Sequence, residues 1–231
     1  MLAFWTVATP LIAIVGIPWT LLTGKIDFLY GISMRAAWFG ARLAGVKVKV
    51  FGAEHLDSGQ TYIFMSNHAS NLDPPILLPL IPRRTSVLVK KELFQIPILG
   101  YAMLLGSLVP VDRSNRETAI ASLRAAAGVL GLGINMTIFV EGTRSPDGQL
   151  LPFKKGPFHL AIESGVPVVP ITIAETYRIM PKGRFGIHPG AATVIFHPAI
   201  NPRQYLEREA LMNVVRERIA SALPQPNRSG G

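Results

Sequence analysis

The chain is 231 residues long, with 49% apolar and 16% charged residues and a formal net charge of +9 at pH 7. This length accommodates one large domain, or a domain with an appendage, around a sizeable core. The basic excess favours an anionic partner, namely a nucleic acid, a phospholipid surface or a phosphorylated substrate. The sequence has no cysteine, which excludes disulfides, thiolate metal sites and a cysteine nucleophile.

The first 24 residues contain no charged side chain. As a helix they are long enough to cross the hydrocarbon layer of a bilayer, which is about 30 Å thick. Pro10 and Pro18 interrupt the run, and a membrane helix tolerates such prolines better than a short soluble helix does. No basic segment precedes the run and no small-residue cleavage site ends it, so the pattern is not typical of a cleaved signal peptide.

Residues 26–45 form a second, nearly apolar stretch, in which Arg35 and Arg42 share one helix edge. Two such helices can span the bilayer or lie as a hairpin within one leaflet. A buried helix pair in a soluble core is the alternative. Most charges between residues 25 and 49 are basic, which places the following domain on the cytoplasmic side. We therefore predict a membrane-associating two-helix element over residues 1–45, at the cytoplasmic face of a bacterial inner membrane.

From residue 46 onward, short β-branched runs alternate with helical patterns. The predicted strands are 46–51, 61–65, 86–90, 107–111, 136–140, 168–173 and 192–197. The predicted helices are 74–81, 95–105, 115–131, 157–164 and 203–222, the third of them starting at a capping box of Ser114 and Glu117. This alternation predicts an α/β domain over 46–223, with a mixed, largely parallel sheet of about seven strands flanked by helices. Residues 224–231 (PQPNRSGG) are expected to be a disordered tail.

His68 and Asp73 lie in the stretch 66–75 (SNHASNLDPP), directly after the second predicted strand. Ligands of α/β sheets usually bind at the carboxyl ends of strands. A loop that folds the Asp73 carboxylate back onto the His68 imidazole gives a general base with an orienting group. The same Asp73 before Pro74 and Pro75 is also a helix-start signal, with aspartate as the N-cap. From this spacing alone, the second interpretation is the commoner one.

The stretch 139–150 (FVEGTRSPDGQL) also follows a predicted strand. The backbone N–H groups of Gly142 and Thr143 and the planar guanidinium of Arg144 suit a phosphate or a carboxylate. The Ser-Pro-Asp-Gly sequence that follows is equally typical of an ordinary turn. A third polar stretch (GSLVPVDRSN) contains Arg113, for which a local ion pair at a helix start is the simpler explanation.

Four short blocks follow one another between residues 60 and 175. Their residues are Asn67-His68-x-x-x-x-Asp73, Val111-Asp112-Arg113, Phe139-x-Glu141-Gly142-Thr143-Arg144-Ser145 and Val166-Pro167-Val168-Val169-Pro170. In order and spacing these blocks resemble the glycerophospholipid acyltransferase family, most of all its 1-acyl-sn-glycerol-3-phosphate (lysophosphatidic acid) acyltransferases. One departure is Val140, where the family usually has a proline before the glutamate.

The resemblance implies that His68, oriented by Asp73, takes the proton from the sn-2 hydroxyl of lysophosphatidic acid. That oxygen then attacks an acyl thioester directly and gives phosphatidic acid, with no acyl-enzyme. The resemblance also implies an acyl-chain contact at residues 165–170 and an acceptor site made by Arg113, Glu141, Gly142, Thr143 and Arg144. The donor is a thioester of coenzyme A or of acyl carrier protein. No cofactor or metal is expected, because the five histidines lack the spacing of paired ligands.

Three alternatives compete with this prediction. Within the class, the acceptor is another lyso-lipid, such as a lysophospholipid or an amino-acid lyso-lipid. A serine hydrolase is disfavoured because the sequence contains no G-x-S-x-G. A non-enzymatic membrane-surface or nucleic-acid-binding protein is the third alternative, and its basic residues are dispersed and not interleaved with aromatic residues as nucleic-acid binding requires. The expected partners are therefore a phospholipid membrane, the lyso-lipid and the thioester donor.

Overall fold

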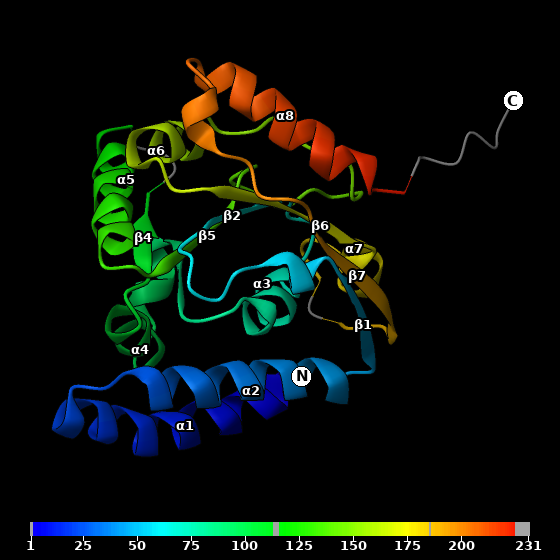
Figure 1. Ribbon diagram of the computed structural model, residues 1–231. Helices are drawn as coiled ribbons and strands as arrows, with labels where there is room; N and C mark the ends of the chain where they lie inside the picture. Colours follow the sequence, from blue (N-terminus) through cyan, green and yellow to red (C-terminus); the bar gives the residue numbers. More distant parts are fainter. Residues whose placement is uncertain (1, 113–115, 185, 225–231) are drawn as a thin grey trace, which may run out of the picture.

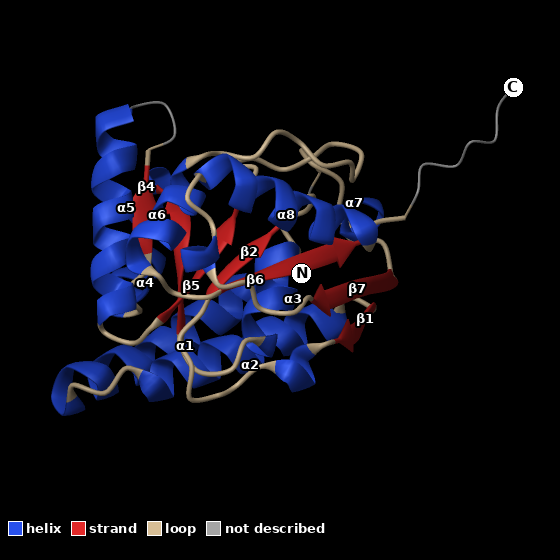
Figure 2. Cartoon of the chain, turned by 45° about the horizontal axis from the view of Figure 1, so that its top comes forward, coloured by secondary structure: helices blue, strands red, loops and turns tan. Residues whose placement is uncertain are grey.

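The computed structural model describes residues 2–112, 116–184 and 186–224, and within them seven strands form one sheet. The strand order is β1-β7-β6-β2-β5-β3-β4. The strands are β1 Val46–Phe51, β2 Ile63–Ser66, β3 Thr85–Lys90, β4 Val109–Val111, β5 Asn135–Phe139, β6 Val168–Ala174 and β7 Gly190–Phe196. β6 and β7 are antiparallel and the other neighbours are parallel, as the arrows in Figure 2 show. The predicted mixed, largely parallel sheet is confirmed.

Helices cover both faces of this sheet (Figure 1). The helices are α1 Leu2–Thr23, α2 Asp27–Leu43, α3 Asp73–Leu77, α4 Leu99–Leu105, α5 Arg116–Gly131, α6 Gly156–Ser164, α7 Thr176–Ile179 and α8 Arg208–Ser221. The α1–α2 pair lies on the side of α3 and α4, while α6 and α8 lie on the opposite side of the sheet. The result is a three-layer α/β architecture with two cores.

The central strand β2 shows how the sequence separates the two cores. Phe64 packs on the side of α2 and α3, whereas Ile63 and Met65 pack on the side of α5, α6 and α8. Successive side chains of a strand point to opposite faces, so a strand buried on both faces needs an unbroken apolar run. Because both faces are filled, the end of β2 is held rigidly, and the polar loop after it starts from a fixed point.

The N-terminal helices α1 and α2 form an antiparallel pair with close contacts. A Cβ atom on Gly40 would lie 2.8 Å from the ring of Phe4, so the glycine lets the two helices approach. Residues 4–23 of α1 have a mean hydropathy of 1.6, and this helix is long and apolar enough to cross a membrane. Both predicted helices are present; their association with a membrane stays a prediction.

Local differences from the prediction have simple causes. Residue Asp73 is not the N-cap of α3: Leu72 precedes the helix, and the Asp73 side chain turns back toward the loop. The prediction missed α7, whose four residues are too short to show a period. The predicted helices at 95–105 and 203–222 each begin in a separate 3₁₀ turn. The capping box at Ser114 and the tail beyond Pro224 lie outside the described residues.

Candidate active site

The imidazole of His68 and the carboxylate of Asp73 are in direct contact. Nδ1 of His68 lies 2.7 Å from Oδ2 of Asp73. The same oxygen accepts the backbone N–H groups of Ala69 at 2.7 Å and Ser70 at 2.8 Å. An ionised carboxylate only accepts hydrogen bonds, and beside it the imidazole tautomer with its proton on Nδ1 presents the lone pair of Nε2. The loop therefore folds the carboxylate onto the base, as the general-base interpretation requires.

The side-chain amide of Asn67 anchors the His68 loop to β6. Nδ2 of Asn67 donates to the carbonyl of Ile173 at 2.8 Å, and its Oδ1 accepts the N–H of the same residue at 2.8 Å. These two bonds replace a rung of the β ladder just beyond the paired part of β2 and join the loop to β6. A buried amide whose nitrogen and oxygen each make a hydrogen bond fixes the direction in which the chain leaves the strand.

The His68 ring is enclosed on one side and reachable on the other. It stacks on the ring of Phe139 with a centroid distance of 4.2 Å, and 13% of the His68 side chain is exposed. Asp73 behind it is completely buried. A buried orienting carboxylate beneath a partly exposed imidazole is the arrangement that a general base needs, because the substrate has to reach only Nε2.

Glu141 supports this loop from the third block. Its Oε1 accepts the backbone N–H of His68 at 3.1 Å, and its Oε2 accepts the N–H of Leu151 at 3.2 Å. The side chain is only 2% exposed. Burial raises the pKa of the Glu141 carboxyl to about 7, although the two N–H donors act in the opposite direction. Glu141 thus faces inward and positions the loop.

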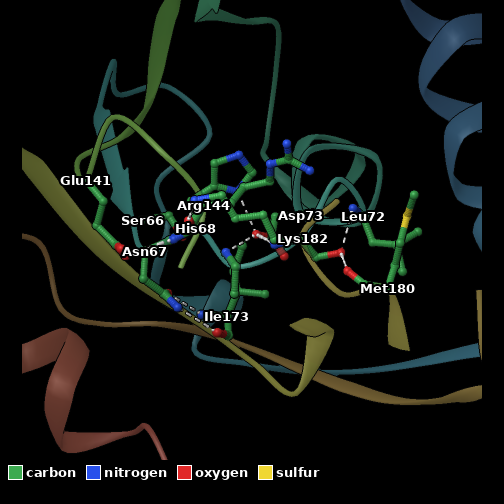
Figure 3. Close-up of polar contacts among 12 residues, drawn as sticks. Ser66, Asn67, His68, Leu72, Asp73, Glu141, Arg144, Ile173, Met180 and Lys182 are labelled. Atoms are coloured by element: carbon green, nitrogen blue, oxygen red, sulfur yellow. Dashed lines mark hydrogen bonds and ion pairs between the residues drawn. The ribbon is translucent and has the colours of Figure 1, made fainter. Parts of the chain in front are cut away.

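Two cationic residues lie beside the base, on different segments. The backbone N–H of Ser145 donates to the carbonyl of His68 at 2.7 Å, which places Arg144 next to the His68 loop. The ammonium of Lys182 donates to the carbonyl of Arg144 at 2.8 Å. Figure 3 shows His68, Asp73, Arg144 and Lys182 gathered in one region. The hydroxyl of Ser70 donates to the carbonyl of Met180 at 2.9 Å, so the segment that carries Lys182 is also joined to the His68 loop.

The sequence prediction placed His68, Asp73 and Arg144 together, and the structure brings them together. It missed Lys182, because the only local signal is a Pro-Lys-Gly turn after β6 and no residue of the four blocks is near it in sequence. Of the other predicted binding residues, Gly142 has a φ of 69° and Thr143 is exposed. Arg113 lies outside the described residues.

An apolar cavity of about 580 Å³ lies against the loop that joins His68 to Asp73. Asn71, Leu72 and Pro74, on and just after this loop, are among its lining residues. Its remaining walls come mainly from the apolar faces of α1, α2 and α4. Residues 165–170, which the fourth block suggested for the acyl chain, do not line this cavity; Val168 and Val169 are fully buried in the sheet. An oriented imidazole, two cations and an apolar cavity equip the site for proton transfer on an amphipathic, anionic substrate.

Comparison with known proteins agrees with this class of site. The acyltransferase family model matches residues 47–174. A 1-acyl-sn-glycerol-3-phosphate acyltransferase of Limnanthes douglasii is 38% identical over 198 residues, which make up 84% of this chain and 68% of that protein. The human 1-acyl-sn-glycerol-3-phosphate acyltransferase alpha is 37% identical over 134 residues, covering 58% of this chain and 47% of that protein.

The solved structures give the same answer. The crystal structure of the 1-acyl-sn-glycerophosphate (LPA) acyltransferase PlsC from Thermotoga maritima matches with a TM-score of 0.79 at 30% identity. The match covers 95% of this chain and 91% of that one, so it includes the sheet and the helices that precede it in the sequence. The chain belongs to the acyltransferase family, and the family prediction made from the four blocks is confirmed.

Proposed function

We propose that this protein transfers a fatty acyl group from a thioester to the free sn-2 hydroxyl of lysophosphatidic acid and so forms phosphatidic acid. The observation that carries the proposal is the His68–Asp73 pair, joined at 2.7 Å and set beside Arg144. It is supported by relatives whose names state this activity and which include one with 38% identity over 84% of the chain.

In the proposed reaction, Nε2 of His68 takes the proton of the acceptor hydroxyl. The oxygen attacks the thioester carbonyl, a new ester bond forms, and the carbon–sulfur bond breaks. The proton then passes to the departing thiolate, so atoms and charge balance without an acyl-enzyme. Asp73 keeps the ring in the correct tautomer and stabilises the imidazolium while it exists. A general base of this kind contributes about 10²- to 10⁴-fold to the rate.

The acceptor phosphate would bind to Arg144 and Lys182. The guanidinium of Arg144 offers a planar pair of donors that fits phosphate oxygens, and Lys182 adds a second positive charge within reach of the same group. Glu141 does not contact the phosphate in this proposal, because its carboxylate is buried and faces two backbone N–H groups. Arg113 and the loop residues Gly142 and Thr143 are retained from the sequence prediction as further candidates for this site.

The acyl chain of a bound lipid would occupy the apolar cavity between the α1–α2 pair (called the hairpin below) and α3–α4. A cavity of about 580 Å³ is within the usual range of about 300–1,000 Å³ for small-molecule sites. Because Asn71 and Leu72 of the His68 loop line the cavity, a lipid bound there would have its head group near His68. We keep both thioesters, of coenzyme A and of acyl carrier protein, as candidate donors, with no further cofactor.

The domain at 46–223 would work at a membrane surface, held there by the helices within 1–45. The exposed side chains of α1 are predominantly apolar, and the first loop after it carries exposed Lys25. Such a pair of helices suits the cytoplasmic leaflet of a bacterial inner membrane. The substrate and product would then stay within the leaflet.

The test is the His68→Ala variant, assayed with one acyl donor against a panel of acceptors. The panel contains lysophosphatidic acid, a lysophospholipid with a larger head group and an amino-acid lyso-lipid. We expect transfer to lysophosphatidic acid in the wild type, loss of about 10²- to 10⁴-fold in the variant, and unchanged binding to vesicles. If the wild type acylated only another lyso-lipid, that lyso-lipid would replace lysophosphatidic acid as the proposed acceptor. Full activity in the variant would remove His68 as the base.

A further inference from the structure

A second apolar surface lies outside the N-terminal hairpin, on the segment 93–104. The sequence has no charged residue between Glu92 and Asp112. Several large apolar side chains of this segment are between 36% and 57% exposed: Leu93, Ile96, Ile98, Leu99, Tyr101 and Leu104. Isolated apolar residues on a surface are ordinary, but a contiguous group this large marks an interaction site. We call these six residues the α4 surface.

The backbone presents this surface by an unusual turn. Ile98, the residue before α4, has a positive φ of 66°, which a β-branched residue rarely adopts. Gly100 follows at a close approach, since a Cβ atom there would lie 2.0 Å from the carbonyl oxygen of Phe94. Strain of this kind is retained where the surrounding structure requires a particular orientation. Here it leaves Ile98 and Leu99 exposed beside the hairpin.

The α4 surface adjoins the helix that is long and apolar enough to cross a membrane. α4 contacts α1, and both Figure 1 and Figure 2 show it next to the α1–α2 pair. Ile98 and Leu99 are exposed and also line the apolar cavity, which Trp5 and Thr9 of α1 line as well. The cavity wall is therefore continuous with the outer surface at the place where α1 and α4 meet.

We propose that the α4 surface enters the same bilayer leaflet as the α1–α2 pair, and that a lipid passes sideways from the leaflet into the cavity at the place where α1 and α4 meet. The occupant is a phospholipid leaflet, because the surface is uncharged, carries an aromatic residue and is continuous with the exposed apolar face of α1. The inference rests on the membrane association in the proposed function and adds a second point of contact to it.

The absence of cysteine makes a direct test simple. Three exposed leucines are replaced singly to give Leu11→Cys on α1, Leu104→Cys on the α4 surface and Leu206→Cys before α8, on the far side of the sheet. Each thiol is labelled with an environment-sensitive nitrobenzoxadiazole dye. The proteins are mixed with vesicles of phosphatidylcholine and phosphatidylglycerol that carry a nitroxide near the carboxyl end of one acyl chain.

We expect the Leu104 and Leu11 probes to be quenched to within about twofold of each other, and the Leu206 probe to be quenched little. Quenching at Leu11 with none at Leu104 would overturn the inference and leave the membrane hairpin standing. An unquenched probe at both positions would overturn the membrane association as well. The three probes thus separate failure of this inference from failure of the proposed function.

A charge variant provides an independent measurement. Leu104 is exposed and is not among the cavity-lining residues, so Leu104→Glu leaves the site intact. A charge in the leaflet is costly, and we expect vesicle binding to fall by about tenfold or more, whereas Leu206→Glu has no effect. Transfer to a vesicle-bound acceptor should fall with it, while transfer to a short-chain acceptor below its critical micelle concentration is unchanged. Wild-type vesicle binding by Leu104→Glu would contradict the proposal.

Discussion

The carboxylate of Glu141 accepts the backbone N–H of His68 at 3.1 Å, so the third block supports the His68 loop of the first block. The other oxygen of Glu141 binds the N–H of Leu151 in the following loop. One buried side chain therefore fixes the separation between the His68 loop and the segment after β5. The sequence prediction gave Glu141 a place in the substrate site; the geometry supports a positioning role, in which it acts through the His68 backbone.

The first prediction concerns Glu141 and pH. Its pKa is about 7 in the folded protein and 4.5 in the unfolded chain. Between these values the folded protein binds a proton that the unfolded chain has lost, so the free energy of unfolding falls as pH rises through this window and levels off above it. With about 1.4 kcal/mol per pKa unit, the fall is on the order of 3 kcal/mol. Glu141→Gln should remove this dependence, which urea unfolding at several pH values would measure.

The variant should also lower activity at neutral pH. A glutamine has one acceptor oxygen, so one of the N–H groups of His68 and Leu151 loses its partner, and a buried unsatisfied donor costs about 1–3 kcal/mol. Glu217→Gln, at an exposed position on α8, is the matched control and should keep the wild-type slope. If Glu141→Gln also kept that slope, another group would be the one that titrates.

The second prediction concerns the orienting carboxylate. Oδ2 of Asp73 is in contact with three donors. In Asp73→Asn the amide oxygen takes this place, because the N–H groups of Ala69 and Ser70 need an acceptor, but a neutral amide no longer stabilises the imidazolium. We expect kcat to fall by about 10²- to 10⁴-fold with little change in the acceptor KM. Asp57→Asn, whose carboxylate also accepts a local N–H, should be unaffected.

Steady-state kinetics and thermal unfolding together separate the chemical role from a structural one. Loss of the charged hydrogen bonds should lower the stability of Asp73→Asn by a few kcal/mol, about 1.5–3 kcal/mol for each charged bond that is not replaced. The catalytic loss should persist at temperatures where the variant is fully folded. A kcat within tenfold of the wild type under those conditions would mean that Asp73 does not orient the base.

The strands were predictable because their periodicity is local. β2, β5 and β6 are buried on both faces and therefore appear in the sequence as predominantly apolar runs. Asp73 was harder to assign, because an aspartate before two prolines is also a helix-start signal. Only the fold decides whether the side chain turns forward to the helix or back to the loop. Its three contacts with residues 68–70 give the answer.

Lys182 and the cavity were beyond the reach of the sequence. Lys182 lies 38 positions after Arg144, and only the packing of the turn after α7 against the His68 loop brings the two together. The cavity is made by helices from opposite ends of the first hundred residues, so no local pattern marks it. Such features depend on tertiary contacts between elements that are each ordinary on their own.

The third prediction follows from the place of Lys182. Its ammonium is exposed and donates to the carbonyl of Arg144, so it can turn to a phosphate bound by the Arg144 guanidinium. A hydrogen bond to a charged group contributes about 1.5–3 kcal/mol. Lys182→Ala should therefore raise the KM for lysophosphatidic acid by about 10- to 100-fold and leave kcat within a factor of about two. The control is Arg178→Ala. Arg178 is an exposed arginine on the neighbouring helix α7 and is paired with Glu175.

A second acceptor sharpens this test. A monoacylglycerol has the hydroxyl and the acyl chain of lysophosphatidic acid but lacks the phosphate. Its KM should be the same in the wild type and in Lys182→Ala. Because Lys182 and Arg144 would bind one phosphate, the double variant should also deviate from the product of the single effects. An equal rise of KM for both acceptors would assign Lys182 to the support of the loop.

The fourth prediction concerns the length of the acyl chain. Ala102 of α4 lines the cavity, and Ala102→Phe would fill part of the volume of about 580 Å³. Long chains should then lose more binding than short ones, and each methylene in an apolar pocket accounts for about 1–3 kcal/mol. We expect the ratio of kcat/KM for long over short acyl chains to fall by about tenfold or more.

Leu104→Phe, on the same helix but not lining the cavity, should keep the wild-type ratio. Because overpacking itself costs about 1–3 kcal/mol, thermal unfolding of both variants must accompany the assay. An equal loss of kcat/KM at all chain lengths would mean that the acyl chain whose length affects kcat/KM does not bind in this cavity.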